Sequence, residues 1–231
     1  MAIKGIIFDK DGTLFDFQKS WGTWGIKLIS ELSNGNKGLM TEISKVLKYD
    51  LRKKEFHKNS QFIAGTAEET ASLLLPILSE KSIEQIVSTQ RDLSIHLKQH
   101  PIPLLNKTID ALYSSGYTLG IVTNDLVDPT TTQLIEHKIF SQFELILGHD
   151  SGYGSKPSPS PLLAFCEQFS LKVEEVIMVG DSVHDLIAAK KARILGIGVL
   201  TGLASKSDLI KHSNHVISDI SKLPAWLKEQ L

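Results

Sequence analysis

The chain has 231 residues, enough for one large domain or for a domain with an inserted companion. Its 25 basic and 26 acidic residues nearly cancel, so no overall positive charge favours binding to nucleic acid or to an anionic membrane. With 42% hydrophobic residues, 22% charged residues and Cys166 as its single cysteine, the composition is that of a globular protein of a reducing compartment, neither disordered nor disulfide-bonded.

The first predicted element is a strand over residues 3–8. Its apolar run is unbroken, as expected for a strand that is covered on both faces, and it ends at Asp9 and Asp11. A secretion signal does not continue into acidic residues in this way, and no apolar run of the chain reaches the ~20 residues that span a bilayer. We therefore expect a soluble cytoplasmic protein, monomer or homodimer, with no membrane or nucleic-acid partner.

The next region, residues 16–100, contains no convincing strand. Helical periodicity covers residues 24–32, 39–51 and 83–97, and the pattern Thr66-Ala67-Glu68-Glu69 is typical of a capping box that opens a further helix. So much helix is too long for a crossover between two strands, so we predict an inserted helical domain over 16–100. This insert is mildly basic and the remainder of the chain is mildly acidic.

After the insert, strands and helices alternate. Strands are predicted over residues 118–122, 145–147, 176–179 and 197–200. A helix with apolar positions from Leu104 to Leu112 is followed by Gly116 as its stop signal, and Asp128-Pro129 is typical of an N-cap with Pro at the first helical position. This order predicts an α/β fold: a Rossmann-like parallel sheet core of three α/β/α layers, residues 1–15 and 101–231, built from right-handed βαβ units.

Polar side chains follow four of the predicted strands, where parallel sheets bind their ligands. Asp9 and Asp11 come after the first strand and point the same way, which is unfavourable unless a cation or a proton lies between them. Thr123 and Asn124 follow the second strand and offer a hydroxyl and an amide suited to phosphate oxygens. Taken singly, these are also ordinary turn residues.

Two further groups complete the set. Lys156 follows the third strand in a loop with glycines and prolines, and is a point charge suited to a phosphate unless it is only an exposed loop lysine. Asp181 and Asp185 lie at the tip of the fourth strand and one turn into the next helix, where they face one point or simply complement the helix dipole. Each group alone has an ordinary structural explanation. The four groups together, in order at the ends of four predicted parallel strands, form a specific pattern.

These motifs resemble those of the haloacid dehalogenase superfamily of phosphohydrolases, and within it the phosphoglycolate phosphatase group. The resemblance covers the whole chain, with the insert in the position of that superfamily's helical cap. It implies that Asp9 is the nucleophile that becomes aspartyl-phosphate and that Asp11 is the general acid and base. It further implies that Thr123 and Lys156 hold the phosphoryl group, with Asn124 beside them. Magnesium would be held by Asp9, Asp181, Asp185 and the Asp11 backbone carbonyl.

The sequence departs from the usual pattern at Lys10, where the family has an apolar residue, and at Ser160, where an Asp often stands. Neither change replaces a proposed catalytic group, and Lys10 is a candidate for an effect on substrate choice. In the insert, Arg52, Lys53, Lys54 and Lys58 form a basic cluster. It is either a solvated helix face or a site for a substrate carboxylate.

We therefore expect a Mg²⁺-dependent phosphatase that acts on a small phosphorylated metabolite, 2-phosphoglycolate in the first place. Screening by Mg²⁺ and Lys156 would let one carboxylate attack a phosphate anion, and the second would move the protons. A phosphotransferase of the sugar-phosphomutase kind shares the same motifs. A signalling module that keeps a phosphorylated aspartate is a further alternative, against which the large insert and Asp11 both argue.

Overall fold

The computed structural model describes residues 2–213 and 215–229. The chain divides into two compact units. One contains the residues up to Asp16 together with those from His100 onward, and the other is Phe17–Gln99.

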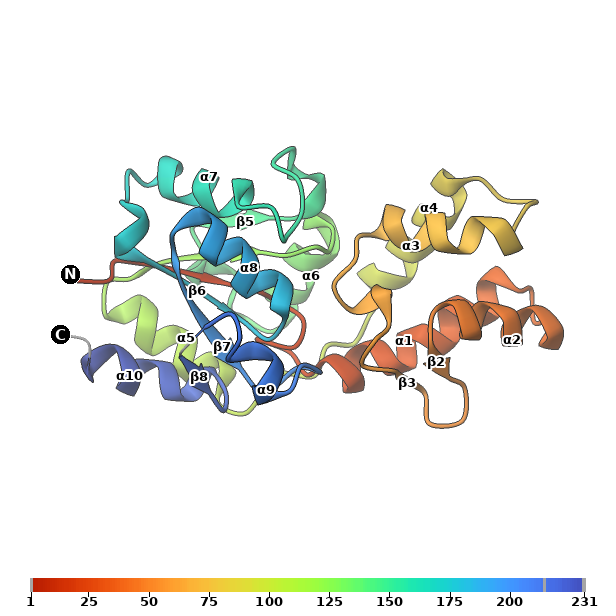
Figure 1. Cartoon of the computed structure of the whole chain (residues 1–231), viewed down its shortest axis with the longest axis horizontal. Coiled ribbons are helices and arrows are strands. Elements are labelled where there is room, and N and C mark those ends of the chain that lie inside the picture. The colour runs from red at the N-terminus through yellow and green to blue at the C-terminus, as the bar shows by residue number, and fades with distance from the viewer. Residues whose placement is uncertain (1, 214, 230–231) are drawn as a thin grey trace. The chain divides into compact units, whose positions relative to one another are not determined.

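The first unit is built on a six-stranded sheet in which every neighbouring pair of strands is parallel (Figure 1). Its order is β5 (Leu145–Leu147), β4 (Thr118–Val122), β1 (Gly5–Phe8), β6 (Val176–Gly180), β7 (Leu195–Val199) and β8 (Val216–Ile217). Phe8 pairs with Ile121 on β4 and with Val179 on β6. The central strand β1 and its two neighbours therefore end level with one another, so the loops after these strands start side by side.

Helices cover both faces of this sheet, which accounts for the unbroken apolar strands. On one face, Ile6 and Phe8 pack with α5 (Leu105–Ser114), α6 (Val127–Glu136) and α10 (Leu223–Glu229). On the other face, Ile7 packs with α7 (Ser160–Gln168) and α8 (Val183–Ala192). Figure 1 shows α5 and α10 on one side of the sheet and α7 on the other. The predicted α/β fold is confirmed.

Two details of this unit differ from the sequence prediction. Asp128 is not an N-cap, because α6 begins at Val127 and Asp128 lies inside its first turn, where its charge faces the positive end of the helix dipole. The last strand, β8, was not predicted, since only two residues pair with β7. Gly116 follows α5 with a φ of 84°, which suits its predicted role as the stop signal.

The second unit, which the structure describes in full, contains four helices: α1 (Phe17–Leu32), α2 (Lys37–Val46), α3 (Ala67–Leu74) and α4 (Ile83–Ile95). Thr66 and Glu69 form both hydrogen bonds of the predicted capping box at the start of α3. The expectation of helix alone is wrong between α2 and α3, because α2 stops at Val46 and a short antiparallel hairpin follows, β2 (Tyr49–Asp50) with β3 (Glu55–Phe56). The basic cluster therefore lies around a hairpin rather than on a helix face.

Aromatic side chains form the interior of the second unit. Trp21 and Trp24 from α1 contact Phe62, whose ring also stacks on that of Phe56 from the hairpin. These tryptophans are buried core residues. Short 3₁₀ turns lie at Gln61–Ile63, Leu75–Ile77, Phe140–Gln142, His149–Ser151, Val173–Glu175 and Ile220–Lys222, and a one-turn helix, α9, at Lys206–Leu209. Within the described part of the chain, no helix combines the length and the apolar character needed to cross a bilayer.

Candidate active site

The site lies where β1, β4 and β6 end. Asp9 follows β1, and its backbone N–H donates to the Val179 carbonyl of β6 at 2.9 Å. Thr123 follows β4, and its N–H donates to the Leu147 carbonyl of β5 at 2.9 Å. These bonds continue the sheet ladder by one residue. The sheet itself therefore holds the first residue of each loop in place.

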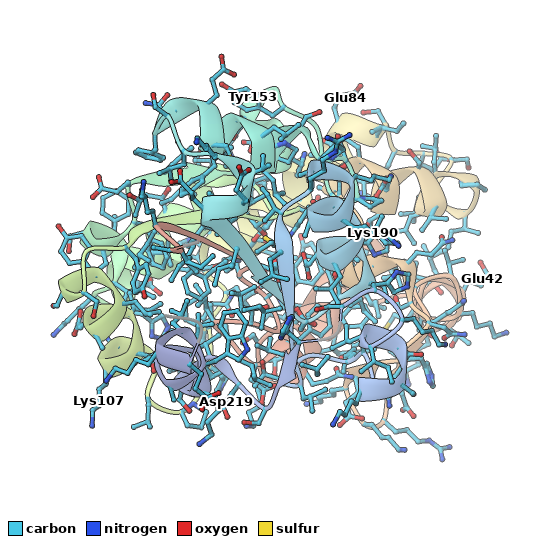
Figure 2. The ribbon with its side chains drawn as sticks, turned by 60° about the vertical axis from the view of Figure 1, so that its left-hand side comes forward. Glu42, Glu84, Lys107, Tyr153, Lys190 and Asp219 are labelled. Atoms are coloured by element: carbon cyan, nitrogen blue, oxygen red, sulfur yellow. The ribbon has the colours of Figure 1, made fainter. Side chains whose placement is uncertain are left out.

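Three carboxylates from two of these strand ends meet at one point. Asp9, Asp181 and Asp185 each offer an oxygen, and the three oxygens lie within 4.8 Å of one another. All three residues are buried. Charged side chains normally extend into water, as Lys107 of α5 does in Figure 2. Three buried acids at this spacing repel one another and call for a cation.

Lys156 supplies one positive charge to this cluster. Its Nζ lies 2.6 Å from Asp9 Oδ1 and 2.7 Å from Asp185 Oδ1, and the residue is 4% exposed. Its backbone is fixed by the Asn124 side chain, which accepts from the Lys156 N–H and donates to the Lys156 carbonyl, both at 2.9 Å. Lys156 is thus no exposed loop lysine, and Asn124 holds the loop that carries it. The predicted contact of Asn124 with phosphate stays a prediction.

Asp185 combines two tasks that the sequence offered as alternatives. Its Oδ2 accepts from the N–H and hydroxyl of Ser182, at 2.9 and 2.7 Å, and so completes the capping box that begins α8. Its Oδ1 faces Lys156. The helix cap therefore fixes the direction of the carboxylate. Asp181, at the tip of β6, accepts from the Thr13 hydroxyl at 3.3 Å.

The proton affinities of these groups are set by burial and by their neighbours. Burial raises the pKa of Asp9 to about 7; the negative charges of Asp185 and Asp11 add to the rise, and Lys156 opposes it. Burial, together with repulsion from Asp9 and Asp185, raises the pKa of Asp181 well above its ordinary value. Burial acts to lower the pKa of Lys156, but Asp185 and Asp9 together outweigh burial and raise it. The cluster therefore attracts cations, protons included.

The donor set fits a hard divalent cation. Three carboxylates and one ammonium leave a formal charge of about −2, which one divalent ion would balance. All the candidate ligand atoms are oxygens, the type that Mg²⁺, Ca²⁺ and Mn²⁺ prefer. The carboxylate of Asp11 is not in this group, and the ligand role that the resemblance gives to its backbone carbonyl stays a prediction.

The Asp11 side chain instead faces a second buried lysine. Lys10 Nζ lies 3.0 Å from Asp11 Oδ2, 2.8 Å from Asp125 Oδ2 and 2.6 Å from Gln133 Oε1. Asp125 comes two residues after Thr123, and its N–H donates to the Thr123 hydroxyl at 3.1 Å. Asp125 could have been suspected from its place at the end of β4. Gln133 stands inside α6 and has no such signal.

Two glycines allow other groups to approach Asp181. Gly12 has a φ of 90°, and a Cβ there would overlap the Asp181 carboxylate. A Cβ at Gly202 would overlap the same carboxylate. The neighbouring Thr201 hydroxyl donates to the Gly12 carbonyl at 2.6 Å and joins the β7 end to the loop after β1. Sequence reasoning missed Gly202 and Thr201, because their role depends on contact across the sheet.

Comparison with known proteins identifies chains of similar sequence. The family model described as haloacid dehalogenase-like hydrolase matches residues 6–199. A phosphoglycolate phosphatase of Vibrio vulnificus is 28% identical over 94% of this chain and 96% of its own length. A phosphoglycolate phosphatase of Aquifex aeolicus is also 28% identical, over 92% of this chain and 98% of its own length. One of Neisseria meningitidis is 30% identical, over 87% and 81%.

Solved structures share the fold at lower identity. A predicted phosphoglycolate phosphatase of Haemophilus somnus superposes with a TM-score of 0.75 at 19% identity and covers 96% of this chain and 97% of its own. A putative haloacid dehalogenase-like hydrolase of Bacteroides fragilis superposes with a TM-score of 0.73 at 22% identity. The match covers 96% of this chain and 99% of that one.

Proposed function

The chain belongs to the haloacid dehalogenase-like hydrolases and is a phosphatase, a hydrolase of phosphoric monoesters, and from this premise we propose its mechanism and substrate. It hydrolyses a small phosphate monoester, 2-phosphoglycolate, with Mg²⁺ and through a phosphorylated Asp9. The observation that carries the proposal is the buried cluster in which Lys156 contacts Asp9 within hydrogen-bond distance beside two further carboxylates. Residues 1–15 and 101–231 form the catalytic core and 16–100 the cap of a cytoplasmic enzyme.

Asp9 is the nucleophile. One of its oxygens attacks phosphorus, the bond from phosphorus to the ester oxygen breaks, and the phosphoryl group remains on Asp9. Attack by an anion on an anion requires screening, and Lys156, 2.6 Å from Asp9 Oδ1, supplies a fixed positive charge at that place. The Thr123 hydroxyl, at the end of the adjacent strand, would donate to a phosphoryl oxygen.

Asp11 moves the protons. In the first step it gives a proton to the departing ester oxygen, which leaves as an alcohol. In the second step it takes a proton from the water whose oxygen attacks phosphorus, and inorganic phosphate leaves a restored Asp9. Asp11 is suited to this task because it follows the nucleophile by two residues and its carboxylate is not part of the cluster that faces the cation.

Asp9, Asp181 and Asp185 would hold Mg²⁺, together with the Asp11 carbonyl. When bound, the ion lowers the repulsion between the phosphate and the carboxylates and favours the ionised form of Asp9. Gly12 and Gly202 leave the Asp181 carboxylate unobstructed by side chains of their own.

The choice of 2-phosphoglycolate rests on the curated relatives of that name that align with nearly the whole chain. Such a substrate carries a carboxylate besides its phosphate. The helical unit has an exposed basic cluster whose positive charges are opposite to that of the carboxylate: Arg52, Lys53, Lys54 and Lys58. We propose that part of this cluster binds the substrate carboxylate.

The test is a panel of phosphate esters assayed for released inorganic phosphate, with Mg²⁺ and with chelator. We expect Mg²⁺-dependent release, highest for 2-phosphoglycolate, and none above background for Asp9→Asn. Asp110→Asn, an exposed acid of α5, is the matched control and should keep full activity. Turnover retained in Asp9→Asn would contradict the mechanism. A phosphoryl group that appears on a sugar-phosphate acceptor, or that persists for minutes on Asp9, would indicate a phosphotransferase or a signalling module instead.

A further inference from the structure

Lys10, which lies between Asp9 and Asp11 in the sequence, is a buried cation. Lys10 is 0% exposed. Removing an ammonium group from water costs several kcal/mol unless oxygens of the protein replace the lost hydration. Lys10 is one of the two positions at which the sequence departs from the usual family pattern, and the proposed mechanism gives it no task.

The structure matches the ammonium group with three oxygens from three places. They are Asp11 Oδ2 at 3.0 Å, Asp125 Oδ2 at 2.8 Å and Gln133 Oε1 at 2.6 Å. An ammonium group has three N–H donors, so these contacts use its full capacity. Burial acts to lower the pKa of Lys10, but Asp11 and Asp125 outweigh burial and raise it, so the group stays charged. Lys10 therefore has no donor left for a substrate.

The anchoring side of this network is rigid. Asp125 Oδ1 accepts from the Leu126 N–H at 2.8 Å, and the Asp125 N–H donates to Thr123. Gln133 is buried in α6. Both anchors are thus fixed by elements outside the loop after β1. Of the three oxygens, only that of Asp11 belongs to a group with a proposed role in the reaction.

We propose that Lys10 is a positioning residue for Asp11: anchored by Asp125 and Gln133, it restrains the Asp11 carboxylate in the place from which a proton reaches the departing ester oxygen. This inference rests on the proposed function. It is a different role from the effect on substrate choice that the sequence suggested for Lys10. A lysine that merely ties the β1 loop to the β4 loop would affect every substrate alike. In the first step, which kcat/KM reports, a lysine that positions Asp11 as the acid matters only for a substrate whose leaving oxygen needs a proton.

That difference provides the test. An alkyl phosphate such as 2-phosphoglycolate needs a proton on its leaving oxygen, whereas p-nitrophenyl phosphate releases a stable anion without one. General acid catalysis contributes about 10²–10⁴-fold. For Lys10→Met we expect kcat/KM to fall at least about 10-fold on the alkyl ester and less than about 3-fold on the aryl ester. The exposed Lys107→Met is the matched control and should change neither.

A second comparison asks whether Lys10 acts through Asp11. In an Asp11→Asn background, Lys10→Met should produce no further loss of kcat/KM, because the group it positions is already gone. If Lys10→Met fails to fold, Asp125→Asn weakens the anchor while keeping an oxygen acceptor, and should show the same split between the two esters at smaller size. Circular dichroism and the unfolding temperature identify the folded variants.

Each outcome bears on the inference. Equal losses on the two esters, additive losses with Asp11→Asn, or full activity of Lys10→Met would overturn it and leave the proposed function standing. If the unsubstituted chain shows no turnover that depends on Asp9, the proposed function itself fails and the inference fails with it.

Discussion

Replacing Asp181 by Asn should stabilise the metal-free protein and destabilise it, relative to the unsubstituted chain, when Mg²⁺ is present. Among the described residues Asp181 forms no ion pair, whereas Asp9 and Asp185 share Lys156. At the 4.8 Å limit of the oxygen separations and an effective dielectric constant of about 20, repulsion from each of Asp9 and Asp185 is worth about 3.5 kcal/mol. Asn keeps an oxygen for the Thr13 hydroxyl but carries no charge.

Lost attraction to Lys156 offsets part of this gain, and the raised pKa of Asp181, which favours its uncharged form in the unsubstituted protein, offsets more of it. We therefore expect a net gain of about 1–2 kcal/mol at pH 8 without metal. For a chain of this length that raises Tm by about 2–8 °C. Mg²⁺ at 100 times its Kd stabilises the unsubstituted protein by about 2.7 kcal/mol. Asp181→Asn loses a ligand and should gain little, so the order of the two Tm values reverses between chelator and Mg²⁺.

Thermal unfolding monitored by circular dichroism in the two buffers measures both values, with Asp110→Asn as the control that should behave as the unsubstituted protein does. A lower Tm for Asp181→Asn in chelator would refute the reasoning, because it would mean that the buried acids do not repel one another. Equal gains from Mg²⁺ in both proteins would show that Asp181 is not a ligand.

Three further predictions concern Asp9, Gly202 and the basic cluster of the helical unit. Because the pKa of Asp9 is about 7 in the fold and lower when unfolded, the metal-free protein should lose stability as the pH rises through 7; a Tm that rises from pH 5.5 to 8 in chelator contradicts this. Gly202→Ala should lower kcat at least about 100-fold, since its Cβ meets Asp181 and an oxygen that helps to hold the ion must move; Gly38→Ala, in α2, should not. Gln at all four positions of the basic cluster should raise KM for acidic phosphate esters and leave kcat unchanged, and unchanged kinetics would remove the cluster from the site.

The sheet could be predicted from the sequence because its strands are covered on both faces. Unbroken apolar runs such as 118–122 and 145–147 match β4 and β5 to the residue. The hairpin of the helical unit could not be predicted, because β2 and β3 contain two residues each and pack on aromatic side chains of the unit's interior. A two-residue strand has too little periodicity to separate from the end of a helix.

The site was predictable to the extent that its residues come directly after strands. Asp9, Asp181 and Lys156 occupy loops after three different strands, and the parallel order alone brings such loops to one edge. Roles that depend on side-chain contact were not predictable. Asn124 has the chemistry of a phosphate ligand and is bonded to the Lys156 backbone, and Gln133 is an ordinary helical residue until the Lys10 ammonium group is seen beside it.

Although the chain has a net charge near zero, its charged side chains are arranged so that Asp9 and Asp11 have different surroundings. Asp9 and Asp11 are separated by one residue and would compete for the same proton or cation if they shared an environment. Lys156 contacts Asp9 within a cluster open to a divalent ion, and Lys10 contacts Asp11 within a separate group closed by Asp125. Each lysine partly neutralises one acid: Lys156 contacts Asp9, and Lys10 contacts Asp11. In the proposed mechanism, the attacking carboxylate of Asp9 and the proton-transferring carboxylate of Asp11 can therefore lie two residues apart in one short loop and keep separate roles.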